Sequence, residues 1–169
     1  MQNLRNTIVT LTLVSLTFAT SAFSAVRQKA KAVAAINVIT ETSGSTTMSD
    51  SYTDVPGALL TFSVPAGKKQ LVQLRFSAES YCFGFSGDAY SWCSMRALVD
   101  GNEMLPNSGI DFAFDANGQT DDAWEGNSME RTLIVGPGTH TVRLQYAVTN
   151  TNVAFTVDDW TLTITQYNK

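Results

Sequence analysis

Apolar and polar residues alternate along most of the chain after residue 32, and this two-residue spacing is typical of β-strands with one buried face. In residues 70–82, for example, Val72, Leu74 and Phe76 share one face. The pattern predicts strands at 33–41, 58–64, 70–82, 93–99, 110–115, 128–135, 140–148 and 153–167. No segment after residue 32 has the spacing of a long amphipathic helix. We therefore predict an all-β protein, an antiparallel β-sandwich of about eight strands.

Turn-forming residues separate the predicted strands. Asp100 and Gly101 predict a tight hairpin, because Asp and Gly adopt positive φ angles at little cost. Residues 43–51 are polar and are interpreted as a loop. In the last strand the apolar positions change from odd to even numbers after residue 157, which predicts a β-bulge at Asp158–Asp159.

The first 24 residues have the features of a secretory signal peptide. Arg5 supplies a positive charge, a short apolar run follows, and small residues precede position 25. We expect cleavage after Ser24 or Ala25, a flexible basic tail over residues 25–32, and a single β-sandwich domain over residues 33–169. No second apolar stretch is long enough to span a bilayer. The predicted location is the periplasm or the extracellular space.

The chain has two cysteines, Cys82 and Cys93. Export would place them in an oxidising compartment, where a cysteine pair usually forms a disulfide. Each cysteine shares the parity of the apolar residues in its own strand, so both sulfurs are expected on the buried face. We therefore predict a Cys82–Cys93 disulfide across the base of a hairpin formed by the two strands. The alternative is a reactive thiol.

The formal net charge is −4, and acidic residues are concentrated in the middle of the chain. Nine acidic residues and one basic residue, Arg96, lie between Cys82 and Glu130. Nucleic-acid binding requires a basic surface, so this distribution excludes a nucleic acid as partner. An acidic surface can attract a cation or a basic partner, but a soluble acidic surface is the simpler interpretation.

Aromatic residues around the cysteines are candidate ligand contacts. They are Tyr81, Phe83, Phe85, Tyr90 and Trp92. Flat apolar rings with a polar rim suit stacking on sugar rings, so residues 83–92 are a candidate carbohydrate-binding loop. The alternative, which the sequence favours, is that these rings fill the open end of the sandwich.

Acidic residues after position 114 supply further candidates. Asp115, Asp121, Asp122 and Glu125 carry oxygens that suit calcium, although their spacing does not match an EF-hand and a solvated loop is the simpler interpretation. Glycoside hydrolysis needs two facing carboxylates, which the same loop could supply. His140 is the only histidine and so the only possible imidazole base, but we expect an exposed or edge position at the start of a strand. No other cofactor is predicted, and the pattern indicates a protein that is not an enzyme.

Four segments carry a resemblance to known proteins: 75–80 (RFSAES), 98–101 (LVDG), 136–146 (GPGTHTVRLQY) and 157–164 (VDDWTLTI). In this order they resemble a group of small exported bacterial β-domains of unassigned function. The turn in FSVPAGKKQL, residues 62–71, is similar to that of jelly rolls of the tumour-necrosis-factor and complement globular-head type. The resemblance implies a jelly-roll-like sandwich and a homo-oligomer, because such jelly rolls are commonly trimeric. It implies no functional residues.

These observations predict an exported, non-enzymatic β-sandwich with a binding or structural role at the cell surface, in the periplasm or outside the cell. The expected partner is a glycan or a surface protein. One alternative is a carbohydrate-binding module that uses the aromatic residues of 83–92. A second alternative is a glycan-cleaving enzyme that uses the loop carboxylates.

Overall fold

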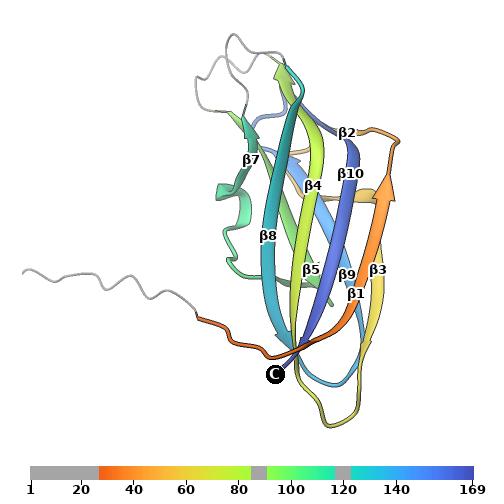
Figure 1. Cartoon of the computed structure of the whole chain (residues 1–169). Helices are drawn as coiled ribbons and strands as arrows, with labels where there is room; N and C mark the ends of the chain where they lie inside the picture. The colour runs from red at the N-terminus through yellow and green to blue at the C-terminus, as the bar shows by residue number, and fades with distance from the viewer. Residues whose placement is uncertain (1–26, 85–90, 117–122) are drawn as a thin grey trace, which may run out of the picture.

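The computed structural model describes residues 27–84, 91–116 and 123–169, and this part of the chain folds into two antiparallel sheets (Figure 1). The predicted signal peptide, residues 1–24, lies outside the described residues. Within the described ranges, no helix is both long and apolar enough to cross a membrane. The two antiparallel sheets confirm the predicted all-β antiparallel sandwich.

The first sheet has the strand order β1–β10–β4–β8, and β2 also pairs with β10. The second sheet has the order β3–β9–β5–β6, and β7 also pairs with β5. The strands are β1 (Val33–Glu41), β2 (Ser45–Thr47), β3 (Thr53–Val64), β4 (Gln70–Gly84), β5 (Trp92–Val99), β6 (Asn102–Glu103), β7 (Ala113–Ala116), β8 (Glu125–Val135), β9 (Gly138–Val148) and β10 (Val153–Asn168). Figure 1 shows the first sheet in front, with β9 and β3 of the second sheet behind it.

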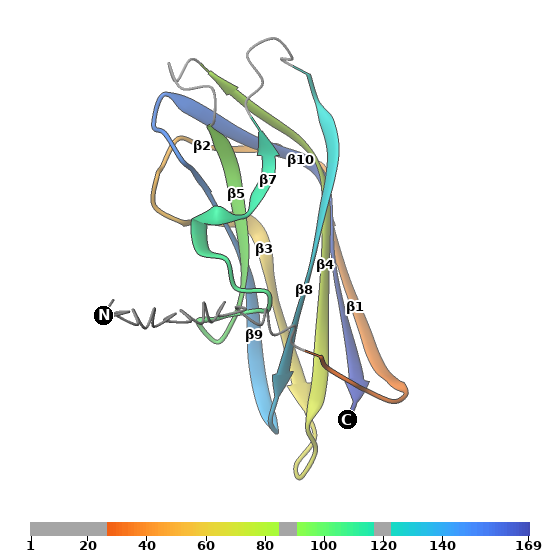
Figure 2. The same ribbon diagram turned by 90° about the vertical axis from the view of Figure 1, so that its left-hand side faces the viewer.

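The described residues form ten strands rather than about eight, because short pairings escape the alternation pattern. β2 lies within the segment that the sequence predicted to be a loop, and its central Thr46 hydrogen-bonds Thr156 of β10, with 2.7 Å between the two Oγ1 atoms. The predicted strand 110–115 is wrong in its first half. A 3₁₀ turn, η1 (Gly109–Asp111), precedes β7 there (Figure 2), because the Ile110 carbonyl accepts hydrogen bonds from side chains instead of pairing in a sheet.

The core lies between the two sheets and is built from the alternating inward residues. Phe76 of β4 is fully buried, and its ring centroid lies 5.8 Å from those of Phe114 and Trp160. Phe155 extends the same cluster, 6.1 Å from Phe114. Burying each such side chain contributes about 1.5–3 kcal/mol. Burial of the alternating apolar side chains therefore helps to hold the two sheets together.

The predicted irregularities of β10 and of the β5–β6 turn are both confirmed. The pairing of β10 with β4 shifts register between Asp158 and Thr161, and Asp159 has a φ of 42°. This bulge allows the apolar residues on either side of it to face the core. At the turn, Asp100 and Gly101 have φ angles of 51° and 82°, as a tight two-residue hairpin requires.

The predicted Cys82–Cys93 disulfide is present, with 5.9 Å between the two Cα atoms. The predicted hairpin is wrong: β4 belongs to the first sheet and β5 to the second, and the two strands do not pair. The bridge therefore crosses the core and joins the two sheets at one end. Alternation predicts which face of a strand is buried, but both sheets of a sandwich bury a face against the same core, so parity could not distinguish a hairpin from a crossing.

Candidate functional site

Three aromatic side chains stack on the outer face of the first sheet, near the end of β4. The ring centroids of Tyr81 and Phe83 are 4.4 Å apart, with planes inclined by 14°. Those of Tyr81 and Trp124 are 5.5 Å apart, with planes inclined by 29°. Trp124 is 50% exposed, and the other two rings are half-buried. We call Tyr81, Phe83 and Trp124 the aromatic platform.

Strand alternation and register together create the aromatic platform. In β4, Ser80 and Cys82 point into the core, so Tyr81 and Phe83 point outward. The antiparallel pairing of β4 with β8 sets Ser80 opposite Glu125. Trp124 directly precedes Glu125, so it lies just beyond the last pair of this ladder, where its ring stacks on Tyr81.

Polar groups border the aromatic platform on the same face. Thr156 of β10 pairs with Tyr81 and is hydrogen-bonded to Thr46. Glu79, the next outward residue of β4, is exposed and lies opposite Gly126 of β8. A Cβ atom placed on Gly126 would meet no other atom within 4 Å, so the surface beside Glu79 is open. The rings are thus bordered by groups that can hydrogen-bond a ligand.

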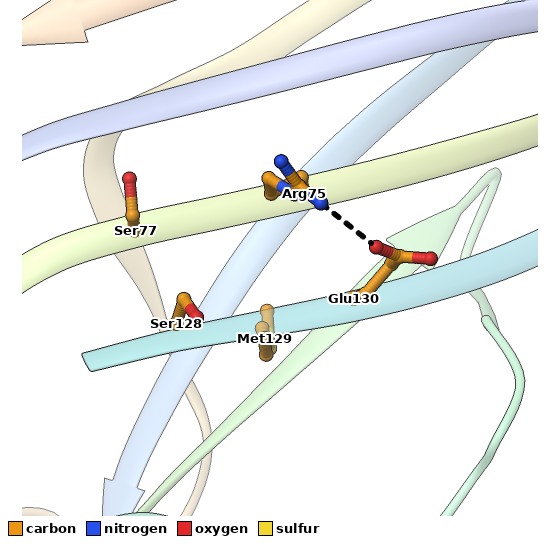
Figure 3. A pocket seen from close by; sticks show the side chains of 5 residues that line it. All are labelled: Arg75, Ser77, Ser128, Met129 and Glu130. Atoms are coloured by element: carbon orange, nitrogen blue, oxygen red, sulfur yellow. Dashed lines mark hydrogen bonds and ion pairs between the residues drawn. The ribbon is translucent and has the colours of Figure 1, made fainter.

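The same face continues along β4 and β8 into a shallow depression (Figure 3). Its lining residues are Arg75, Ser77, Ser128, Met129 and Glu130. An ion pair of 3.5 Å joins the Arg75 guanidinium and the Glu130 carboxylate. The distance from Tyr81 to Arg75 along β4 is roughly 20 Å, at about 3.4 Å per residue. This face could therefore contact an extended ligand rather than a single small ring.

The aromatic residues predicted from the sequence do not form one group. Phe83 belongs to the aromatic platform, whereas Phe85 and Tyr90 lie outside the described residues. Trp92 is half-buried in the second sheet, and its indole N–H donates a 2.8 Å hydrogen bond to the Ile110 carbonyl. Trp92 therefore holds η1 against β5 and lies apart from the other rings.

The sequence reasoning missed Trp124, the most exposed ring of the aromatic platform. The signal was present, because a tryptophan lies within an otherwise polar segment four residues before the predicted strand 128–135. Exposed tryptophans are costly to keep in water, so such a position indicates a contact surface. Recognising its partner Tyr81 would have required the pairing of β4 with β8.

The candidate calcium ligands are only partly described. Asp115 is buried, and its carboxylate accepts hydrogen bonds from the Ser80 hydroxyl (2.6 Å) and from the Ala116 amide (2.7 Å). The pKa of Asp115 is raised, because the effect of burial exceeds the opposing effect of the hydrogen bond from Ser80. Glu125 is exposed, and Asp121 and Asp122 lie outside the described residues. Within the described ranges no three potential metal ligands come together.

His140 joins two turns at the opposite end of the second sheet. Its Nδ1 lies 2.6 Å from the Asp100 carboxylate and its Nε2 lies 3.0 Å from the Gly136 carbonyl. Hydrogen bonds from His140 and from the Thr141 amide lower the pKa of Asp100. The imidazole also packs on Phe62, with 5.3 Å between ring centroids. Both ring nitrogens are engaged, so these contacts fix the turns in place.

Comparison with known proteins gives a distant similarity in fold. No family model and no curated protein matches the chain. Among solved structures, the dimeric latent PorU from Porphyromonas gingivalis is similar to it, with a TM-score of 0.37 and 13% sequence identity. The match covers 83% of this chain and 14% of PorU, so the chain spans a small part of that protein's length.

Proposed function

We propose that the chain is an exported, non-enzymatic carbohydrate-binding β-sandwich whose ligand lies across the aromatic platform. The observation that carries this proposal is the stack of Phe83, Tyr81 and exposed Trp124 on one open sheet face. A jelly-roll-like subtype and passage through an oxidising compartment are parts of the same proposal. The Cys82–Cys93 disulfide supports the second part, because such bridges persist mainly outside the reducing cytosol.

The chemistry of a sugar ring fits this surface. One face of a pyranose presents C–H groups, and these are attracted by the negative face of an aromatic ring. The hydroxyl groups at the sugar's edge need hydrogen-bond partners, which Glu79 and Thr156 supply beside the rings. Because an unpaired polar group is costly to bury, this combination selects for a sugar over a purely apolar ligand.

The charges around the aromatic platform favour a neutral glycan over an anionic one. Glu79 lies two residues before Tyr81 in β4 and is the strand neighbour of Asp158 in β10. A third acidic residue, exposed Glu125, directly follows Trp124. The one cation of the depression, Arg75, is already paired with Glu130. Sulfated or uronic-acid polymers would therefore meet like charge at this face.

The test is binding of neutral polysaccharides and oligosaccharides, followed by intrinsic fluorescence and titration calorimetry. Of the three tryptophans, Trp160 is buried and Trp92 is half-buried, so a change of fluorescence on binding reports chiefly on Trp124. We expect Trp124→Ala and Tyr81→Ala to weaken binding at least about tenfold, as for a central aromatic contact. The matched control is Leu59→Ala, which removes another exposed apolar side chain from the second sheet.

Two results would overturn the proposal. One is the absence of binding to every neutral glycan of a broad panel. The other is binding that Trp124→Ala and Tyr81→Ala leave unchanged. Release of new reducing ends from a bound glycan would instead identify a glycan-cleaving enzyme, because hydrolysis of the chain creates one reducing end for each bond broken.

A further inference from the structure

The outer edge of the first sheet is formed by β1, and its exposed side chains are apolar. Val33, Ile36 and Val38 are 51%, 61% and 56% exposed. Within the described residues, β1 pairs with β10 on one side and with no strand on the other. Residues 33–40 contain no charged side chain and no proline.

Such an edge lacks the usual protection against pairing with another strand. Sheet edges are normally protected by charged residues, by proline or by bulges. The opposite edge of the same sheet, β8, carries Glu125, Glu130 and Arg131, and the edge strand β3 of the other sheet carries Pro56 and a register shift. In β1 a register shift occurs only at Val33–Ala35. The run from Ala35 to Glu41 is regular and open.

The charges that flank this run are opposite at its two ends. Arg27, Lys29 and Lys31 precede β1 and are exposed. Glu41 ends the strand opposite Trp160, next to the bulge residues Asp158 and Asp159 of β10. A neutral strand with a basic start and an acidic end is complementary to a second copy that runs in the opposite direction.

We propose that this edge is a homodimer interface, in which β1 pairs antiparallel with β1 of a second copy. The occupant is another copy of this chain because the strand's own ends supply the complementary charges. An antiparallel pair of identical strands also has the two-fold symmetry that most dimers adopt. The interface goes beyond the proposed glycan binding and does not depend on it.

The middle of the regular run decides which residues meet. Val38 lies at the centre of Ala35–Glu41, so a two-fold axis there sets Val38 opposite Val38 of the second copy. Ile36 then lies across from Thr40 on the same outer face. Each basic segment 27–31 extends past the acidic end of the other copy. The pairing covers the exposed apolar side chains and gives hydrogen-bond partners to the open backbone edge.

The first experiment is a crosslinking test on the chain expressed with its own N-terminal segment and purified after export. Val38→Cys places two thiols opposite one another at the two-fold axis, within the distance that a disulfide can bridge. We expect a covalent dimer on a non-reducing gel, and its loss on reduction. Leu59→Cys is the matched control, because it introduces an equally exposed cysteine on the other sheet and should stay largely monomeric.

The second experiment measures mass in solution by light scattering and sedimentation. We expect the unmodified chain to dimerise, and Val38→Lys to raise the dimer dissociation constant at least about tenfold, because like charges would meet at the axis. Leu59→Lys should leave the constant unchanged, with thermal unfolding confirming that both variants fold. High salt should weaken the dimer by screening the flanking charges. A monomer at all concentrations, or a dimer indifferent to Val38→Lys, would refute this interface.

Discussion

Breaking the Cys82–Cys93 disulfide should lower stability by about 3 kcal/mol. The two cysteines are separated by 11 positions in sequence, and closing a loop of that length in the unfolded chain accounts for an effect of this size in the chain-entropy model. For a domain of this length, each kcal/mol corresponds to about 2–4 °C in the melting temperature. We therefore expect reduction to lower the melting temperature by about 6–12 °C.

The structure adds a second contribution when the sulfurs are removed instead of reduced. Cys82 and Cys93 are both buried between the sheets. A Cys82→Ala, Cys93→Ala double variant leaves space in the core, and the loss of buried atoms costs about another 1–2 kcal/mol. The order of stability should be oxidised protein, reduced protein and double alanine variant. Calorimetry and urea unfolding of the three forms measure both steps.

The location of the bridge predicts which part of the structure should open first when the disulfide is lost. Because β4 and β5 belong to different sheets, no backbone ladder replaces the bridge between them. Hydrogen exchange should therefore accelerate at Cys82, Cys93 and their neighbours before it does so around Phe76. If oxidised and reduced proteins melt within about 2 °C of each other, the unfolded chain does not gain the expected freedom and the entropy argument fails.

Three substitutions test other parts of the structure. Asp100→Asn should lower the melting temperature at pH 7, and this deficit should shrink as pH falls below the ordinary value of 3.8. The lowered pKa of Asp100 gives stability that is present above its unfolded pKa and is lost as pH falls through the folded value. Asp115→Asn should do the reverse. The raised pKa of Asp115 means that wild-type stability is lost as pH rises above the ordinary value of 3.8 and through the folded value, so the variant should gain stability relative to wild type over that rise. Phe76→Ala should cost about 3–5 kcal/mol in urea unfolding, because it empties the ring cluster around Trp160.

The strands could be predicted where one side chain in two meets the core. Residues 70–82 alternate without interruption, and even the bulge at Asp158–Asp159 follows from the change of parity around it. β2 could not be predicted, because its three polar residues form a strand only by pairing with residues of β10 more than a hundred positions away. Assigning β4 and β5 to one hairpin failed for the same reason: the pattern of a strand records its buried face and not its partner.

The candidate site shows the same division between local and non-local information. Phe83 was identified because it lies beside a cysteine in a run of aromatic residues. Trp92 shares that run but turns to the Ile110 carbonyl, a partner that no local pattern reveals. Trp124 joins Tyr81 only through the register of β4 against β8. Local composition thus found Phe83 and Trp92 but not Trp124, and the sheet pairing decided which rings share a surface.

The two proposals meet in one geometric consequence. A two-fold axis that relates antiparallel strands stands perpendicular to the sheet, so both copies would keep the outer faces of their first sheets on the same side. Two aromatic platforms would then face one long polymer, and linked sites of this kind raise overall affinity by about 10²–10⁴ without a new contact. Val38→Lys should accordingly weaken retention on a polysaccharide at least about tenfold and leave the affinity for a short oligosaccharide unchanged, whereas Trp124→Ala should weaken both. A monomeric Val38→Lys variant that holds the polysaccharide as tightly as wild type would show that the two platforms do not bind the same polymer chain.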